Sequence, residues 1–128
     1  MAGSVLGEKV LRKEDPKFLT TGGVYMDDFA DPRLDGAGWV VYARSPIAHG
    51  TIVSIDTDDA RSMPGVIAVF TADDLGLAPT PSAFNPAVAR TALASGKVRW
   101  VGEPVVAVVA ETYSQAVDAA ETVLIDVD

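Results

Sequence analysis

The chain has 128 residues, 48% of them hydrophobic and 22% charged, which is typical of one globular domain. Its formal net charge of -8 argues against nucleic acid and against anionic membrane surfaces as partners, because proteins bind both through Lys and Arg. The absence of cysteine excludes disulfides, thiolate metal sites, Fe–S ligation and a cysteine nucleophile within this chain.

The sequence predicts neither secretion nor membrane insertion. No long apolar run precedes the first charged residues, which argues against a secretory signal. The longest apolar run, Val105 to Ala110, is too short to cross a bilayer. We therefore expect a cytoplasmic protein.

Residues 1–38 are interpreted as an irregular N-terminal arm that is part of the same domain as the core over residues 39–128. The arm is rich in Gly, Pro, Asp and Lys and shows no sustained hydrophobic period, with turns expected at residues 21–23 and 31–32. Because such a segment cannot form a core by itself, it must lie on the rest of the chain or on a neighbour.

The first half of the core predicts strands and short helices. Runs of β-branched and aromatic residues indicate three strands, at Trp39 to Arg44, Thr51 to Asp56 and Val66 to Phe70. Asp56 or Thr57 caps a short helix between the last two strands, which Met63-Pro64-Gly65 ends. Thr71 has the spacing of an N-cap to Asp74 and opens a single helical turn.

The second half begins with a long connection, Leu77 to Gly96, that carries no strong structural signal. Val105 to Ala110 is apolar on both faces and belongs in the middle of a covered sheet. Thr112 and Gln115 have capping-box spacing and introduce the clearest helix, which Leu124 to Asp128 follows as a final strand. Strand, helix and strand in succession suggest a right-handed crossover. The predicted fold class is α/β (α+β), with mixed strands and a few short helices.

The residues offer little chemistry. The single histidine, His49, stands in a turn without a second group to orient it or to share a metal, so a turn histidine bonded to backbone is favoured. The paired carboxylates at 27–28, 58–59 and 73–74 are neighbours in sequence, which makes them poor acid/base partners. Arg99 and Trp100 are able to dock an aromatic or anionic group, but a tryptophan closing a sheet edge is the favoured interpretation.

Three stretches resemble, in order, the N-terminal α/β hammerhead domain of the xanthine dehydrogenase, aldehyde oxidase and aerobic carbon monoxide dehydrogenase family. They are RKEDPKFLTTGGVYMDD, VYARSPIAHGTIVSIDTDDARSMPGVIAVFTADDL and VRWVGEPVVAVVAETYSQAVDAAETVLIDVD. The sequence departs from the family pattern at Thr21, where a first glycine is usual, and at Gly50, where the family has Ala after Ala-His. Both departures fall in turns.

The resemblance implies a hammerhead-type mixed sheet within the large subunit of a molybdenum hydroxylase. It implies molybdopterin, Fe–S clusters and FAD for the parent complex, with the catalytic and pterin-binding residues outside this chain. This chain alone is expected to bind no cofactor or metal and to be inactive. The implied partners are the molybdenum-binding remainder of the large subunit and the Fe–S and flavin subunits. The parent substrate stays open.

What the resemblance implies for this chain is a structural and interface role, either as a domain or as a separately encoded subunit. The residues expected to make interface contacts are Arg12, Glu14, Asp15, Tyr25, Asp28, Arg44, Ser45, His49, Gly102 and Glu103. Turn formation or internal ion pairing is an equal alternative for each. Two other readings stay open: a stand-alone homo-oligomeric binding or scaffold module, and a small enzyme that uses His49 with a nearby carboxylate.

Overall fold

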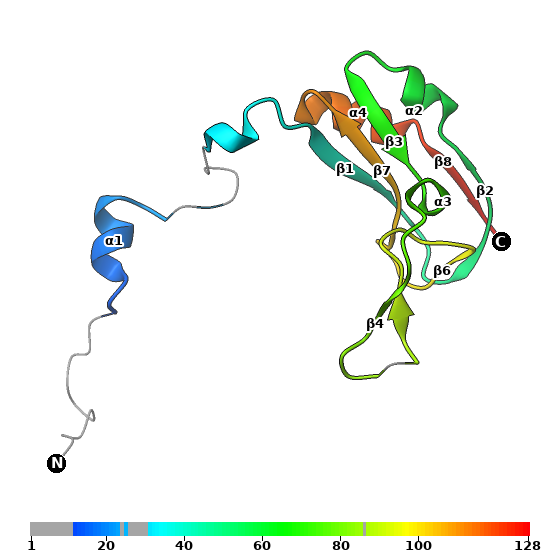
Figure 1. Ribbon diagram of the computed structural model, residues 1–128, viewed down its shortest axis with the longest axis horizontal. Coiled ribbons are helices and arrows are strands. Elements are labelled where there is room, and N and C mark those ends of the chain that lie inside the picture. Colours follow the sequence, from blue (N-terminus) through cyan, green and yellow to red (C-terminus); the bar gives the residue numbers. More distant parts are fainter. Residues whose placement is uncertain (1–11, 24, 26–30, 86) are drawn as a thin grey trace. The chain divides into compact units, whose positions relative to one another are not determined.

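The computed structural model describes residues 12–23, 25, 31–85 and 87–128. The chain divides into two units, residues 1–35 and residues 36–128 (Figure 1). The described residues of the first unit contain two short helical segments, and those of the second contain the strands and the other helices.

The first unit holds α1 (Asp15–Thr20) and a 3₁₀ turn, η2 (Pro32–Leu34). Proline lies in the first turn of each segment, where its missing N–H leaves no helical hydrogen bond unmade. The Asp31 carboxylate caps η2 by accepting the backbone N–H of Arg33 at 2.9 Å. The turn expected at residues 31–32 is the start of η2, whereas α1 was not predicted, because the arm shows no sustained hydrophobic period.

The main sheet of the second unit has the order β1-β7-β3, with bounds Trp39–Arg44, Pro104–Ala110 and Val66–Phe70. The central strand β7 is the apolar run of the sequence, and Val108 lies opposite Val41 on one side and Val69 on the other. The prediction that this run forms the middle of a sheet is confirmed.

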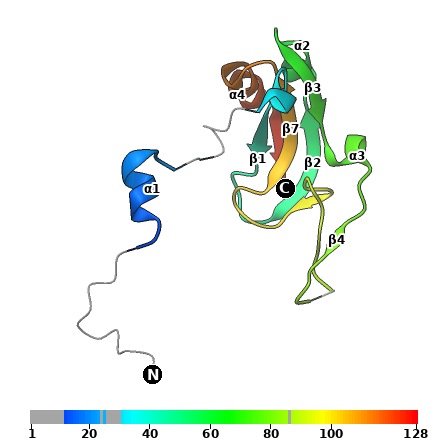
Figure 2. The same ribbon diagram turned by 60° about the vertical axis from the view of Figure 1, so that its left-hand side comes forward.

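A second sheet has the order β6-β2-β8, with bounds Lys97–Val98, Gly50–Asp56 and Leu124–Val127. Its strands lie beside those of the main sheet (Figure 2) and add Ile52, Ile55 and Val127 to one shared hydrophobic core. Between β3 and β6 in sequence, β4 (Thr80–Pro81) and β5 (Ala89–Arg90) pair as a small separate hairpin.

The α/β class with few short helices is confirmed, but the strand pairing differs from the expected mixture. Every strand pair in the described part of the chain is antiparallel. The expected crossover from β7 to β8 within one sheet is wrong, because β1 and β3 already occupy both edges of β7. The final strand therefore pairs with β2 instead.

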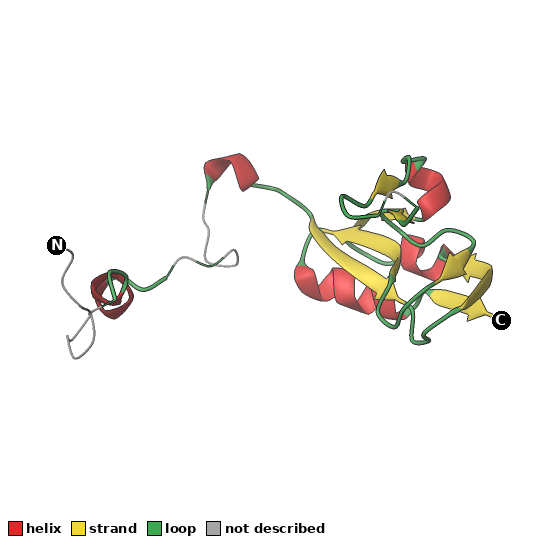
Figure 3. Ribbon diagram, turned by 90° about the horizontal axis from the view of Figure 1, so that it is seen from below, coloured by secondary structure: helices red, strands yellow, loops and turns green. Residues whose placement is uncertain are grey.

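Small residues let the helices approach the core closely. Ala60 of α2 (Asp58–Ser62) and Ala116 and Ala119 of α4 (Tyr113–Glu121) are fully buried. Figure 3 shows α4 along one face of the main sheet, where Tyr113 meets Trp39 edge to face at 5.9 Å between ring centroids. This face is therefore covered.

The opposite face of the main sheet is apolar and open. Val40 pairs directly with Val109 and is 48% exposed, and Ile67 of β3 is 59% exposed. Tyr42 lies two residues along β1 from Val40, so it belongs to the same face and is also exposed. We call Val40, Tyr42 and Ile67, with the partly buried Val109, the open sheet face.

The helix caps follow the sequence closely. Thr71 is the N-cap of α3 (Ala72–Leu75) as predicted, in a capping box with Asp74, and the predicted capping box of Thr112 with Gln115 is present at α4. Of the two capping residues that the sequence left open for α2, Thr57 is the N-cap but its side chain makes no capping hydrogen bond, and the Asp56 carboxylate accepts the Asp58 N–H at 3.0 Å. No helix in the described residues has the length and hydrophobicity needed to cross a membrane.

Candidate functional site

Four of the predicted contact residues meet at one end of the main sheet. Arg44 ends β1 and lies opposite Pro104 across a bulge, which brings Ser45 beside the turn that precedes β7. The Ser45 N–H donates to the carbonyl of Glu103 at 2.9 Å, and the Gly102 N–H donates to the carbonyl of Ser45 at 2.8 Å. The pairing of β1 and β7 thus continues into the turn at residues 99–103.

Glu103 holds this turn from the inside. Its side chain is buried, with a residue exposure of 3%. One carboxylate oxygen accepts the backbone N–H of Arg99 at 2.5 Å, and the other accepts from the Arg99 guanidinium at 3.1 Å. Gly102 adopts a φ of +84°, a conformation that L side chains rarely occupy. The glutamate and the glycine together fix the shape of the turn that presents Trp100.

Arginines stack on aromatic rings at the same end. The guanidinium of Arg44 lies 5.3 Å from the centre of the Tyr42 ring and donates to the carbonyl of Gly102 at 2.9 Å. The guanidinium of Arg90 lies 5.8 Å from the centre of the Trp100 ring. Such stacking favours a cation over a ring face and limits the freedom of a long side chain. The second contact joins the β4–β5 hairpin to the turn at 99–103.

The other predicted contact residues are placed elsewhere. His49 is exposed in the loop between β1 and β2. The expected hydrogen bond from its ring to backbone is not found among the described residues, and neither is an ion pair. Arg12, Glu14, Asp15 and Tyr25 belong to the first unit, in which Tyr25 is 70% exposed. Asp28 lies outside the described residues, as does Asp27.

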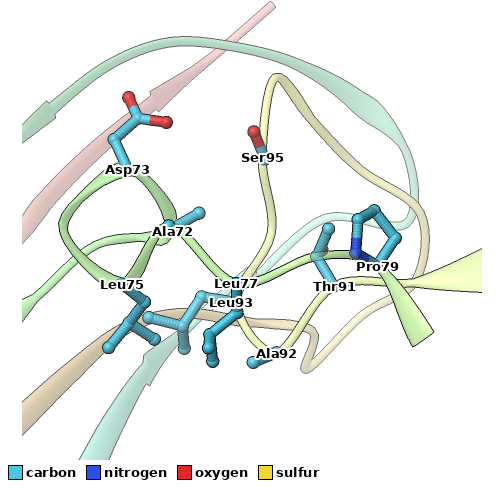
Figure 4. Close-up of a pocket in the computed structure, with 10 residues that line it drawn as sticks. Ala72, Asp73, Leu75, Leu77, Pro79, Thr91, Ala92, Leu93 and Ser95 are labelled. Carbon is cyan, nitrogen blue, oxygen red and sulfur yellow. The ribbon is translucent and has the colours of Figure 1, made fainter.

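Two adjoining pockets open on the side of α3, each of about 370 Å³. The first is lined by Leu75, Leu77 and Leu93 at its base and by Asp73 and Ser95 at its rim (Figure 4). The second continues toward β2 and shares Asp73 and Ser95 with the first. Asp73 is the one charged residue in either lining, so neither pocket brings together a pair of titratable side chains.

Catalytic and metal-binding groupings are not found in the part of the chain that the structure describes. No group of three His, Cys, Asp or Glu residues there could hold a metal ion. The ion pairs found there are Arg33–Asp31, Arg61–Asp74 and Arg99–Glu103. The geometry at the end of the main sheet instead gathers arginine and aromatic side chains on one surface, which suits protein binding more than catalysis.

A family model described as the a/b hammerhead domain of aldehyde oxidase and xanthine dehydrogenase matches residues 20–128. The chain belongs to this family. The resemblance inferred from the sequence is confirmed, and the hammerhead domain is also the architecture of the solved structure compared below.

Among the relatives, the nicotine 6-hydroxylase large subunit of Paenarthrobacter nicotinovorans is 39% identical over 131 residues, covering 98% of this chain and 16% of that protein. The carbon monoxide dehydrogenase large chain of Hydrogenophaga pseudoflava is 39% identical over 119 residues, covering 91% and 14%. A crystal structure of a Cu,Mo-CO dehydrogenase superposes with a TM-score of 0.80 at 38% identity, covering 95% and 15%. The chain therefore spans about a sixth of the length of these relatives.

The described residues of the hammerhead domain do not by themselves fit a molybdenum cofactor. The described residues offer no cluster of metal ligands, and the linings of the two pockets include no Lys or Arg to meet an anionic cofactor group. No chemical step is therefore assigned to the residues described above.

The sequence pointed to Arg44, Ser45, Gly102 and Glu103 through the family resemblance, but it did not identify Tyr42, Phe84 or Arg90 as surface residues. Phe84 and Arg90 lie in the connection from Leu77 to Gly96, which shows no regular pattern. A phenylalanine among Pro, Ser, Ala and Asn was the available signal, because no predicted strand or helix there would bury it.

Proposed function

We propose that this hammerhead domain is a structural and interface part of a molybdenum-dependent oxidoreductase, and that residues outside this chain form the catalytic centre. The parent enzyme would hydroxylate a carbon centre, or oxidise carbon monoxide, with molybdopterin bound by the large subunit. Fe–S clusters and FAD on partner domains or subunits would carry the electrons away. We also propose that the parent enzyme acts in the cytoplasm.

The family match over residues 20–128 supports this function most strongly, since the relatives are named as large subunits of a hydroxylase and a dehydrogenase. The open sheet face gives independent support. Soluble monomeric domains rarely leave a contiguous sheet face apolar unless another surface covers it. A domain that is one part of a larger enzyme would have such a surface to meet.

The relatives' names leave the substrate open, because nicotine and carbon monoxide differ widely in size and structure. In this proposal the substrate is selected by residues outside the chain, so the hammerhead domain alone would neither bind nor oxidise it. Its contribution would be to position the catalytic part of the large subunit.

The proposal is tested by purifying the tagged protein from its native host and identifying the associated polypeptides by mass spectrometry, with molybdenum and iron analysis. We expect recovery of a molybdenum-binding polypeptide segment together with iron. A metal-free preparation that contains only residues 1–128 as a symmetric oligomer would refute the proposal and favour a stand-alone scaffold module.

A further inference from the structure

We propose that Tyr42, Arg44, Phe84, Arg90 and Trp100 form a docking surface for an acidic face of a neighbouring domain of the same large subunit. This set is called the aromatic–arginine end. The inference rests on the proposed function above and deepens it by naming the surface and the chemistry of its partner.

The basic residues of the second unit are concentrated at one end, where Glu103 and Asp128 also lie. Residues 36–128 contain eleven Asp and Glu but five Lys and Arg, which are Arg44, Arg61, Arg90, Lys97 and Arg99. Four of these five lie at the end of the domain formed by the 99–103 turn, the end of β1 and the bases of β5 and β6; the exception is Arg61, which pairs with Asp74. In an acidic domain, this end is the one that favours an acidic partner.

Arg44 and Arg90 are available to that partner. Arg99 is neutralised by the buried Glu103, but neither Arg44 nor Arg90 has a carboxylate within ion-pairing distance among the described residues. The stacking on Tyr42 and on Trp100 holds both guanidinium groups in place. A pre-positioned guanidinium presents paired N–H donors that match the two oxygens of a carboxylate, with little side-chain entropy left to lose.

Phe84 supplies an exposed apolar anchor on the same hairpin that carries Arg90. It is fully exposed, in the connection between β4 and β5, on a hairpin that projects from the rest of residues 36–128 (Figure 1). The Arg90–Trp100 contact ties the base of this hairpin to the 99–103 turn. Aromatic residues and arginine are the residue types enriched among those that dominate binding energy at protein interfaces.

The surface is continuous with the open sheet face, because Tyr42 belongs to both. A partner that covers the sheet would meet apolar residues along β1 and then cationic and aromatic residues at the end of the strand. A folded protein surface can offer this combination, with an apolar area rimmed by carboxylates. The net charge of -8 disfavours a nucleic acid or an anionic lipid surface, whose negative charge is not confined to a rim around an apolar area.

A neighbouring domain of the same polypeptide is the occupant that fits best. The relatives carry this domain on chains of which it covers about a sixth. Domain interfaces within one chain are smaller and more polar than obligate subunit interfaces. The tether supplies a high effective concentration, so a few charged pairs and one aromatic anchor are enough to hold the contact.

The test is photo-cross-linking in the complex purified from its native host. Phe84 is replaced by the photoreactive analogue p-benzoylphenylalanine, which its full exposure should tolerate, and the cross-linked peptides are identified by mass spectrometry. The control carries the same analogue at Leu124 of β8, which is exposed. Leu124 lies opposite Asp56, at the end of β2 that is far from Thr51. We expect Phe84 to cross-link to a segment of the large subunit outside residues 1–128 that is rich in Asp and Glu.

The charge contribution is tested in the same preparation. Arg44→Glu combined with Arg90→Glu should lower the cross-link yield at Phe84 by about tenfold at low ionic strength. Arg61→Glu is the matched control, because it reverses a charge away from this surface, and it should leave the yield unchanged. Raising the salt concentration should lower the yield of the otherwise unaltered chain, which is a readout independent of variant folding.

Several results would overturn the inference. Cross-links to a separate subunit or to a second copy of residues 1–128, or none at all, would each refute it while molybdenum in the preparation still supports the proposed function. An unchanged yield in the double variant and at high salt would refute the acidic partner. A preparation that contained neither molybdenum nor any polypeptide sequence outside residues 1–128 would refute the proposed function, and this inference with it.

Discussion

The buried carboxylate of Glu103 gives the sharpest stability prediction. In Glu103→Ala the backbone N–H of Arg99 loses its acceptor in a protected site, which costs about 1–3 kcal/mol for an unsatisfied buried donor. The lost contact to the Arg99 guanidinium adds about 0.5–1 kcal/mol, a low value because that side chain is 35% exposed to water. We therefore expect Glu103→Ala to lower the free energy of unfolding by about 1.5–4 kcal/mol.

Glu103→Gln separates the two contributions. The glutamine amide oxygen is still able to accept the Arg99 N–H, so this variant should lose about 1 kcal/mol. Arg99→Ala keeps the backbone donor and removes the guanidinium from a buried carboxylate, so it should cost more than Glu103→Gln.

The assay is urea unfolding of the 128-residue chain followed by far-ultraviolet circular dichroism, which reports on the whole fold. Fluorescence is unsuitable as the main signal, because Trp100 lies in the same turn as Glu103. The reasoning would be refuted if Glu103→Ala remained within about 0.5 kcal/mol of the unaltered chain. Equal losses in the alanine and glutamine variants would show that the charge, and not the backbone acceptor, holds the turn.

Three further predictions concern other parts of the second unit. Gly65→Ala should lower the free energy of unfolding in urea by more than about 1 kcal/mol, since Gly65 has a φ of +80° and an added Cβ would lie 2.2 Å from the Gln115 side chain. Gly76 also has a positive φ but has space for a Cβ, so Gly76→Ala should lower the free energy of unfolding by less. Thr112→Ala should cost about 1 kcal/mol by removing the N-cap of α4, and Thr112→Ser should restore most of that loss. Hydrogen bonds from the backbone N–H of Thr71 and, to a smaller extent, from its hydroxyl lower the pKa of Asp74. The ionised carboxylate therefore stabilises the fold above the usual carboxyl range near 4, and this stabilisation is lost as the pH falls through the lowered pKa. If Asp74→Asn kept the full acid sensitivity of the unaltered chain in an acid titration, this assignment would be contradicted.

Local patterns in the sequence were enough to predict most of the elements. The run at Val105 to Ala110 and the capping boxes at Thr71 and Thr112 depend on neighbouring residues, so their structures follow from short stretches of sequence. The family resemblance named Arg44, Ser45, Gly102 and Glu103 as contact candidates, but their meeting was not predicted, because it depends on pairing across the sheet.

The features that were missed depend on long-range geometry. Nothing near Glu103 in the sequence indicates that its carboxylate is buried, because burial depends on how the β1 end packs against the turn. The stacking of Arg90 on Trp100 joins a segment without pattern to a distant turn. The antiparallel pairing of β8 with β2 follows from the occupied edges of β7, which a strand-by-strand reading does not reveal.

The strand order also determines when this domain can fold during synthesis. Strands β1 and β3 emerge from the ribosome early, but their common partner β7 comes last in that sheet. At about 5–20 residues per second, the ribosome completes β7 roughly 3–13 s after β1. For that interval the Trp-Val-Val-Tyr segment of β1 has no partner strand, so it is exposed to aggregation and to chaperone binding. Slower translation before β7 would lengthen this interval, and the yield of folded protein should then become sensitive to codon usage between residues 45 and 104.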